Sequence, residues 1–320
     1  MSIRSRRTSC APCLDGGRII EFPDGEIEAE KSRFPAEPEG FPTLNPDKKI
    51  ACIVLPTYNE AESIPRLLPL IFRESENIPT HELHVLVVDD NSPDGTGECV
   101  RAAMRLYPRL HLISGEKKGL GEAYKRGISH AMAMLAPDLI LQMDADFQHD
   151  PALLPQFVRL CNQGYDLAIG SRFVMGTDIE GLAWHRKFIS VGGTKLVHWF
   201  SGIPPVTDCT SGYRCIRTEL IAKCDFGPYS TRGYSFQSWF LCELLKNGAR
   251  YVEIPLPFPT RLYGHSKLTF RDKVEFLVCL FHLPKWKPAP AGKFARVRER
   301  APAAAIEERL PTEVGSHAQK

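Results

Sequence analysis

The stretch Leu139-Ile-Leu-Gln-Met-Asp-Ala-Asp-Phe-Gln-His-Asp150 carries two carboxylates at the end of an apolar run, and its first five residues are typical of a buried strand. Asp144 and Asp146 can point at one divalent cation, and Gln148 offers a third side-chain oxygen. Such ligands suit Mg²⁺ or Mn²⁺, whose open positions accept phosphate oxygens. The pattern predicts a site for a nucleotide diphosphate. The alternative is an acidic loop that caps the next helix at Asp150-Pro151.

Similar apolar runs occur on both sides of this stretch, and most are followed by a helical pattern. We expect strands at about 50–55, where Pro56 ends the run, and at 83–88, 110–114, 139–143 and 166–170. Helices are expected after a cap at Asn59 and at about 96–107, 119–134 and 151–162. This alternation predicts an α/β fold, a mainly parallel sheet flanked by helices that binds ligands outside its carboxyl edge.

Polar clusters follow three of the expected strands at the end where such ligands bind. They are Pro56-Thr-Tyr-Asn-Glu60, Asp89-Asp90 and Asp144-Ala145-Asp146. The first strand is not followed by the Gly-x-Gly-x-x-Gly pattern of dinucleotide-binding folds, so NAD or FAD binding is not expected. Gly119-Leu-Gly121 precedes a helix after the third strand, where it serves either a close approach to phosphate or a plain helix-entry turn.

Composition limits the possible functions and the domain plan. The formal charge of +2 on 320 residues does not favour nucleic acid binding as the main task. The ten cysteines are scattered, several within apolar patterns, which indicates free thiols in a reducing compartment. Neither a secretory signal nor an apolar run of about 20 residues is found. We expect a flexible extension at 1–47, a catalytic domain at 48–285 and a flexible tail at 286–320.

The pattern becomes helical after the fifth strand. Residues 182–200 combine aromatic and basic side chains, which suits either a membrane surface or packing against the core. Further helices are expected at 233–246 and 274–281, with a strand at 250–258. Asp208 to Arg214 is typical of a turn that leads into a strand, which could line part of the ligand site, although these two residues could instead pair with each other. Arg261 and Lys267 form either a mobile cationic arm for a diphosphate or a solvated loop.

Six motifs in order give the chain a resemblance to a known family. They are Pro56-Thr-Tyr-Asn-Glu60, Val87-Val-Asp-Asp-Asn-Ser-Pro-Asp-Gly-Thr96, Lys118-Gly-Leu-Gly121, Asp144-Ala-Asp146, Ser211-Gly-Tyr-Arg214 and Arg261-Leu-Tyr-Gly-His-Ser-Lys267. Over about residues 48–281 the chain resembles the dolichol-phosphate mannosyltransferase branch of the family 2 glycosyltransferases. The resemblance implies a GT-A fold, a sugar-nucleotide donor, a polyprenyl-phosphate acceptor and inversion at the anomeric carbon.

The resemblance also implies roles for particular residues. Asp146 and Gln148 would hold Mg²⁺ or Mn²⁺. Asp144, Asp146, Arg261 and Lys267 would be catalytic. Arg172 and Arg186 resemble the basic groups of the family near the phosphates. The complete expected donor-binding set is Pro56, Tyr58, Glu60, Val88, Asp90, Asp144, Ala145, Asp146, Arg172, Arg186, Arg261 and Lys267.

The expected activity is transfer of mannose from GDP-mannose to dolichyl or polyprenyl phosphate. The protein would lie on the cytoplasmic face of a membrane, attached by its amphipathic helices, its basic termini or a small membrane-anchoring subunit. A lipid phosphate is already anionic, so it needs no catalytic base, and Arg172, Arg186 and Arg214 are expected nearer to it. The alternatives are a related transferase that uses UDP-glucose or another sugar nucleotide, and a non-catalytic nucleotide-sugar-binding scaffold. Intact Asp144, Asp146, Arg261 and Lys267 argue against the scaffold.

Overall fold

The computed structural model describes residues 48–174, 184–226, 233–257 and 270–285, and the two-residue strands β1 (Leu14–Asp15) and β2 (Arg18–Ile19). Contacts divide the chain into Met1–Pro288 and Ala289–Lys320, and the fold described here belongs to the first unit. The predicted flexible extension and tail lie almost wholly outside the described residues, so their boundaries stay predictions.

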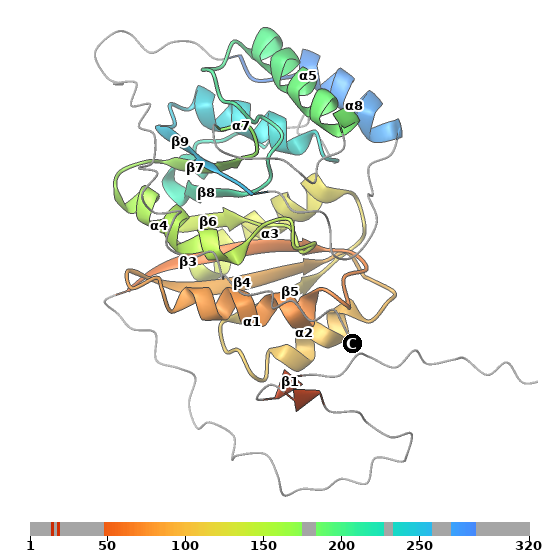
Figure 1. Cartoon of the computed structure of the whole chain (residues 1–320), viewed down its shortest axis with the longest axis vertical. Coiled ribbons are helices and arrows are strands. Elements are labelled where there is room, and N and C mark those ends of the chain that lie inside the picture. Colours follow the sequence, from red (N-terminus) through yellow and green to blue (C-terminus); the bar gives the residue numbers. More distant parts are fainter. Residues whose placement is uncertain are drawn as a thin grey trace, which may run out of the picture. The chain divides into compact units, whose positions relative to one another are not determined.

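A seven-stranded sheet forms the centre of the fold, in the order β5-β4-β3-β6-β8-β7-β9 (Figure 1). Four of its six pairings are parallel, which fits the predicted alternation of strands and helices. The exception is β8, which runs antiparallel to both of its neighbours. The strands are β3 (Lys49–Thr57), β4 (His81–Asp89), β5 (Leu110–Ser114), β6 (Leu139–Gln142), β7 (Leu167–Ser171), β8 (Arg214–Arg217) and β9 (Tyr251–Pro255).

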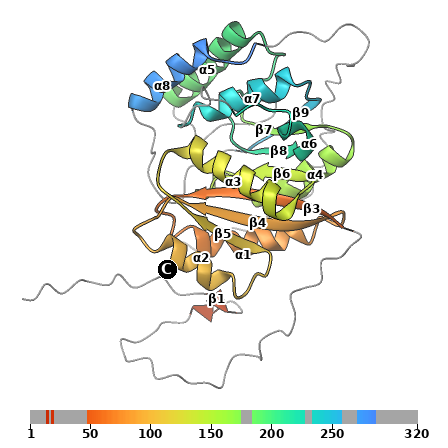
Figure 2. The ribbon, with the colours of Figure 1, turned by 180° about the vertical axis from the view of Figure 1, so that it is seen from behind.

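Helices cover both faces of the sheet, and the alternation of side chains along β3 shows why. Ala51, Ile53 and Leu55 belong to the core under α1 (Ile64–Ser75) and α4 (Leu154–Asn162). Cys52 and Val54 belong to the opposite core, under α3 (Leu120–Leu135) and α7 (Phe236–Lys246). Figures 1 and 2 show α1 in front of the sheet and α3 behind it. The remaining described helices are α2 (Thr96–Ala103), the short 3₁₀ turn η1 (Pro151–Leu153), α6 (Thr218–Ile221), α5 and α8.

Helices α5 (Trp184–Ser201) and α8 (Phe270–Phe281) lie side by side beyond the sheet, as both views show (Figures 1 and 2). Phe200 and Phe281 pack edge to face with their ring centroids 5.1 Å apart. Among the described helices, none combines the length and the apolarity needed to span a bilayer.

Two local predictions need correction. β3 does not end at Pro56 but continues to Thr57. This is possible because β6 stops opposite Val54, so the proline on β3 has only β4 beside it and its missing N–H breaks no ladder bond there. Asn59 does not cap the next helix: it has φ 56°, and the cap position is Ser63.

Candidate active site

Three strand ends bring the predicted polar clusters together at one edge of the sheet. β3, β4 and β6 are neighbours and parallel, so the residues after their carboxyl ends meet there. The Asp90 N–H donates to the carbonyl of Thr57 at 3.0 Å, and Thr57 Oγ1 donates to Asp89 Oδ1 at 3.2 Å. Asp144 follows at the end of β6. The sheet therefore gathers groups that lie far apart in the sequence.

Two carboxylates at this edge bond the neighbouring loops to each other. Asp89 accepts from the backbone and the hydroxyl of Ser92, whose Oγ in turn accepts from the Asn59 N–H at 3.0 Å. Asp94 accepts from the Ala61 N–H at 3.0 Å, and Glu60 takes part through its own N–H, which donates to a threonine hydroxyl on α2. The loop after β4 is thus bonded to the loop after β3, and both are fixed before a ligand binds.

Tyr58 and Asp90 form a wall at this edge of the sheet with two cations that the sequence did not single out. Lys117 Nζ lies 3.3 Å from the centroid of the Tyr58 ring. Arg126 Nη2 donates to Asp90 Oδ1 at 2.7 Å. Burial raises the pKa of Asp90, an effect that Arg126 only partly offsets. A ring face, a carboxylate and two cations suit a nucleoside. The distant sequence positions of Lys117 and Arg126 gave no signal of this grouping.

Asp144 is held from two sides. Tyr124, fully buried on α3, donates its hydroxyl to Asp144 Oδ1 at 2.8 Å. Burial and the neighbouring carboxylate raise the pKa of Tyr124, which keeps it a neutral donor. The Asp144 N–H donates to Nδ1 of His149 at 2.9 Å, and this leaves the other ring nitrogen, 4.0 Å from Asp144 Oδ2, to carry the proton. The carboxylate therefore has a fixed orientation.

Asp146 and Gln148 lie on a sharp bend of the same loop. Phe147 between them has φ 64°, a left-handed conformation that turns the chain back. As a result the Gln148 N–H donates to Asp146 Oδ1 at 3.1 Å. No group of three or more His, Cys, Asp and Glu side chains within the described ranges could hold a metal ion alone. A cation here would depend on few protein oxygens and on those of a ligand, which fits Mg²⁺ or Mn²⁺ on a diphosphate.

The alternative role of the acidic loop as a helix cap also holds. Asp150 accepts from the Ala152 N–H at 2.9 Å at the start of η1, with Pro151 as the first residue. Capping uses Asp150 alone and leaves Asp144 and Asp146 at the sheet edge. The side chains of Val88 and Ala145, both predicted at the donor site, are buried in the two cores, and their contact with a donor stays a prediction.

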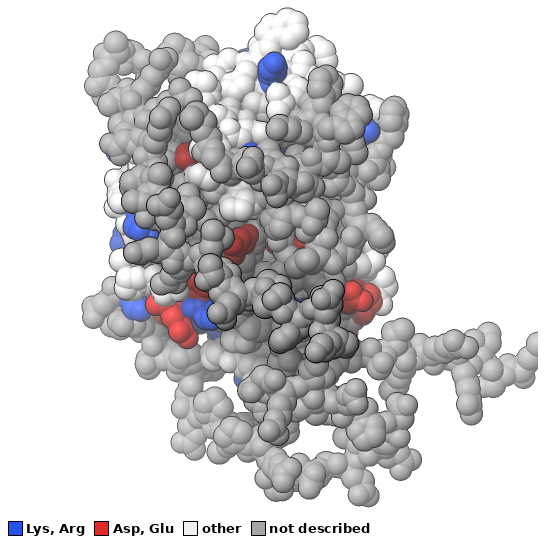
Figure 3. All heavy atoms as spheres, in the orientation of Figure 1, with Lys and Arg blue, Asp and Glu red and all other residues white. Residues whose placement is uncertain are grey.

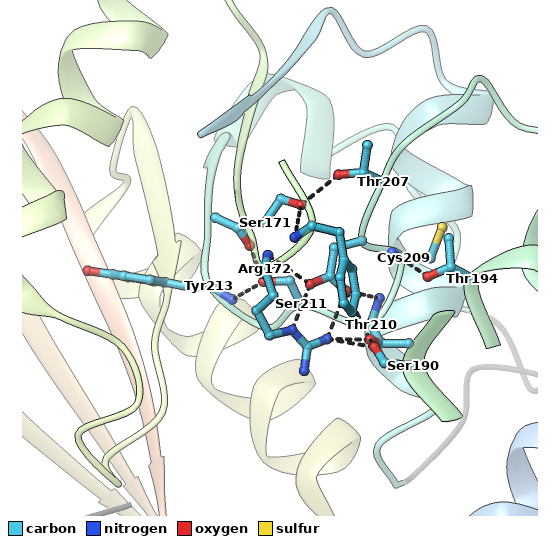
Figure 4. Close-up of polar contacts among 12 residues, drawn as sticks. Ser171, Arg172, Ser190, Thr194, Thr207, Cys209, Thr210, Ser211 and Tyr213 are labelled. Atoms are coloured by element: carbon cyan, nitrogen blue, oxygen red, sulfur yellow. Dashed lines mark hydrogen bonds and ion pairs between the residues drawn. The ribbon is translucent and has the colours of Figure 1, made fainter. Parts of the chain in front are cut away.

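Arg172 forms a buried network at the end of β7, shown in Figure 4. Its guanidinium donates to both carboxylate oxygens of Asp208, and also to Ser190 on α5 and to Thr210. Burial by itself would raise the pKa of Asp208, but Arg172 more than offsets this and lowers it. Glu253 on β9 accepts from the backbone of Asp208 at 3.3 Å. Assignment of Arg172 to the donor phosphates stays a prediction.

Asp208 pairs with Arg172 and not with Arg214, so the alternative pairing is wrong. Arg214 is fully buried, and its guanidinium donates to the carbonyls of Gln237, at 2.8 Å, and Cys209. Burial lowers the pKa of Arg214 to about 10. The guanidinium does not reach the surface of the described structure, and the expected position of Arg214 near the acceptor phosphate stays a prediction. The Arg186 side chain, Arg261 and Lys267 lie outside the described residues, and their roles stay predictions.

Comparison with known proteins agrees with this geometry. The chain belongs to glycosyl transferase family 2, whose model matches residues 52–224, and its α/β architecture is the GT-A fold. It is 32% identical to polyprenol monophosphomannose synthase of Mycolicibacterium smegmatis, over 82% of this chain and 93% of that protein. It is 36% identical to undecaprenyl-phosphate mannosyltransferase of Micrococcus luteus, over 68% of this chain and 86% of that protein. The expected family and fold are confirmed.

A solved structure shows the same fold at lower identity. Glucosyl-3-phosphoglycerate synthase from Mycobacterium tuberculosis, crystallised with Mn²⁺, UDP and glucosyl-3-phosphoglycerate, superposes with a TM-score of 0.50 and 18% identity. The match covers 74% of this chain and 81% of that one. At this identity the match supports the architecture alone. The protein is a glycosyltransferase on the strength of its family and its mannosyltransferase relatives.

Proposed function

We propose that this enzyme transfers mannose from GDP-mannose to a polyprenyl or dolichyl phosphate, with inversion at the anomeric carbon. The supporting observation is the similarity to a polyprenol monophosphomannose synthase, which covers 82% of this chain and 93% of that protein. The wall of Tyr58, Asp90, Lys117 and Arg126 suits a nucleoside, and the assay below decides which sugar nucleotide is the donor.

The residues at the edge suggest how the donor lies. The nucleoside would contact the wall formed by Tyr58, Asp90, Lys117 and Arg126, and the diphosphate would extend along the strand ends toward Asp144 and Asp146. Asp146 and Gln148 would hold Mg²⁺ or Mn²⁺, and this cation would neutralise charge on the departing diphosphate. We propose that Arg261 and Lys267 add further positive charge there.

Asp208 bears on the nature of the nucleophile. A hydroxyl acceptor normally needs a carboxylate to take its proton, whereas a lipid monophosphate is already anionic. Asp208 lies beside Arg172, a residue expected near the acceptor phosphate, but it is completely buried and its oxygens accept hydrogen bonds from the guanidinium of Arg172. It is thus unavailable as a base. This favours a phosphate acceptor.

Membrane attachment is proposed at the paired helices α5 and α8. Apolar side chains are strongly exposed on them, with Trp199 at 80%, Phe281 at 71%, Val278 at 54% and Leu277 at 53%. Figure 3 shows a largely uncharged described surface at the top of the view, where Figure 1 places these helices. Isolated exposed apolar residues are common, but a group of four on adjoining helices suits insertion into a bilayer interface or a small membrane-anchoring subunit. We propose the cytoplasmic face, where sugar nucleotides are available.

One assay tests the proposal. The purified chain is incubated with Mn²⁺, radiolabelled GDP-mannose, UDP-glucose or other sugar nucleotides, and a short polyprenyl phosphate or the matching polyprenyl alcohol. We expect label in lipid only with GDP-mannose and the phosphate. Preference for UDP-glucose would overturn the assignment of GDP-mannose as the donor. Transfer to the alcohol as fast as to the phosphate would overturn the assignment of an anionic nucleophile.

A further inference from the structure

A pair of buried glutamines behind the active site carries polar atoms without partners. Gln237 on α7 is 3% exposed and Gln142 on β6 is fully buried, yet neither amide has a hydrogen-bond partner among the described residues. Leaving a buried polar group unpaired is costly, so such groups in folded proteins usually have a reason. Arg214 contacts both elements, since it lies opposite Gln142 in the register of β6 and β8 and its guanidinium donates to the backbone carbonyl of Gln237.

Only Gln237 is shown to approach the active site. A methyl group added to Gly212 would lie 3.0 Å from Gln237 Nε2 and 3.7 Å from Asp144 Oδ2. Gly212 does not have a left-handed φ, so its backbone does not require glycine. The space favours it, because a Cβ there would press on the amide, which would have to shift by a few tenths of an ångström. The missing side chain leaves the amide and the carboxylate facing one small region.

The order of the strands indicates what occupies that region. The wall formed by Tyr58, Asp90, Lys117 and Arg126 belongs to the β5-β4-β3 side, and Asp144 follows β6. Gly212 and Gln237 lie beyond it, on the β8 side. A donor whose nucleoside lies at β4 and whose diphosphate lies near Asp146 therefore directs its sugar toward Gln237.

The chemistry of the amide fits a sugar and not a phosphate. An amide both donates and accepts, as a hydroxyl does, whereas phosphate oxygens call for cations. We infer that Gln237 is a specificity-determining residue whose amide, beside Asp144, binds a ring hydroxyl of the donor hexose. This inference rests on the proposed function, and it assigns to Gly212 the role of leaving the amide room beside Asp144.

Calorimetric titration of the full chain tests the inference. Mn²⁺ with GDP, and Mn²⁺ with GDP-mannose, are titrated into wild type, Gln237→Leu and the control Gln142→Leu. We expect Gln237→Leu to weaken GDP-mannose binding by about 10-fold, the value of one hydrogen bond to a buried polar group, and to leave GDP binding unchanged. The melting temperature should not fall, since an unpaired amide is lost. Gln142→Leu should change neither affinity. Equal weakening of GDP and GDP-mannose by Gln237→Leu would overturn the inference.

Two further measurements make the test independent of how one variant folds. Gly212→Ala pushes the amide aside and should reproduce the selective loss of GDP-mannose binding. Donors lacking one ring hydroxyl each should reveal a single position at which wild type loses affinity and Gln237→Leu does not. If removal of each hydroxyl weakened binding to Gln237→Leu by the same factor as binding to wild type, at every ring position, the inference would be overturned. If wild type binds another sugar nucleotide in place of GDP-mannose, the donor proposal fails, and the same comparison is made with that sugar nucleotide and its nucleoside diphosphate.

Discussion

Arg172 and Asp208 form a bidentate ion pair, with Nε donating to Oδ2 at 2.7 Å and Nη2 to Oδ1 at 2.8 Å. Asp208 is fully buried, and the side chain of Arg172 is 14% exposed. The pair connects the end of β7 to α5 through Ser190. Removing one partner of the pair should therefore lower the free energy of unfolding by a different amount from removing both.

Asp208→Asn should lower the free energy of unfolding by about 3 kcal/mol or more, because it leaves a buried guanidinium without its counter-charge. The double variant Arg172→Met with Asp208→Leu should cost clearly less, since no charge remains buried. Urea denaturation of both variants measures this. A double variant less stable than Asp208→Asn would show that the network is held by its hydroxyl partners and not by charge.

Asp146→Asn should fold normally and lose Mn²⁺-dependent binding of GDP, because a neutral amide is a poorer ligand for a hard cation than a carboxylate. Turnover should fall by about 10²-fold or more if the cation stabilises the leaving group as strongly as an oxyanion-hole donor stabilises its intermediate. Calorimetry with and without Mn²⁺, beside the transfer assay, measures both. The matched control is Asp150→Asn, which alters only a helix cap. Full activity of Asp146→Asn in excess chelator would rule out the metal assignment.

Replacement of Trp199, Leu277 and Phe281 with Ser should weaken sedimentation with liposomes that contain polyprenyl phosphate, because it removes apolar side chains from α5 and α8. Transfer to a short soluble acceptor should be unaffected. Leu106→Ser is the control, since Leu106 is 70% exposed but lies far from these helices in the chain. Unchanged sedimentation of the triple variant would assign attachment to another element or to a partner subunit.

Acid should destabilise the fold through His84. Burial, His111 and Arg109 lower the pKa of His84 to about 4, from 6.5. A lowered histidine pKa means that the unfolded chain binds the proton first, so the free energy of unfolding should fall as pH drops from about 6.5 toward 4. His84→Phe, which can keep the stack on His111, should reduce this slope. Urea denaturation at several pH values measures it, and an unchanged slope would exclude His84 as the titrating group.

Much of the fold could be predicted because β3, β4 and β6 are continuous apolar runs that end in polar residues, and that pattern specifies parallel strands and a ligand edge together. The antiparallel placement of β8 could not be predicted. Arg214–Arg217 is short and half charged, and its pairing with both β6 and β7 is a tertiary event with no local pattern.

The residues of the candidate site also fall into a group that the sequence predicts and a group that it does not. Asp144, Asp146 and Asp90 were predicted because carboxylates directly after strands have a positional meaning. Lys117, Arg126 and Gln237 were not, because each joins the site from a helix or loop distant in sequence. A glutamine inside an apolar helix such as α7 has no periodicity that distinguishes it from an ordinary polar interruption.

The antiparallel strand also has a consequence for how the chain folds. β8 supplies the hydrogen bonds that join β6 to β7, and β7 in turn carries β9. Until residues near 214 have been synthesised, the sheet can contain β5, β4, β3 and β6 only, and β7 has no edge to join. Chain-length-dependent protease protection on the ribosome should therefore rise in two steps, the first after β6 emerges and the second only after β8.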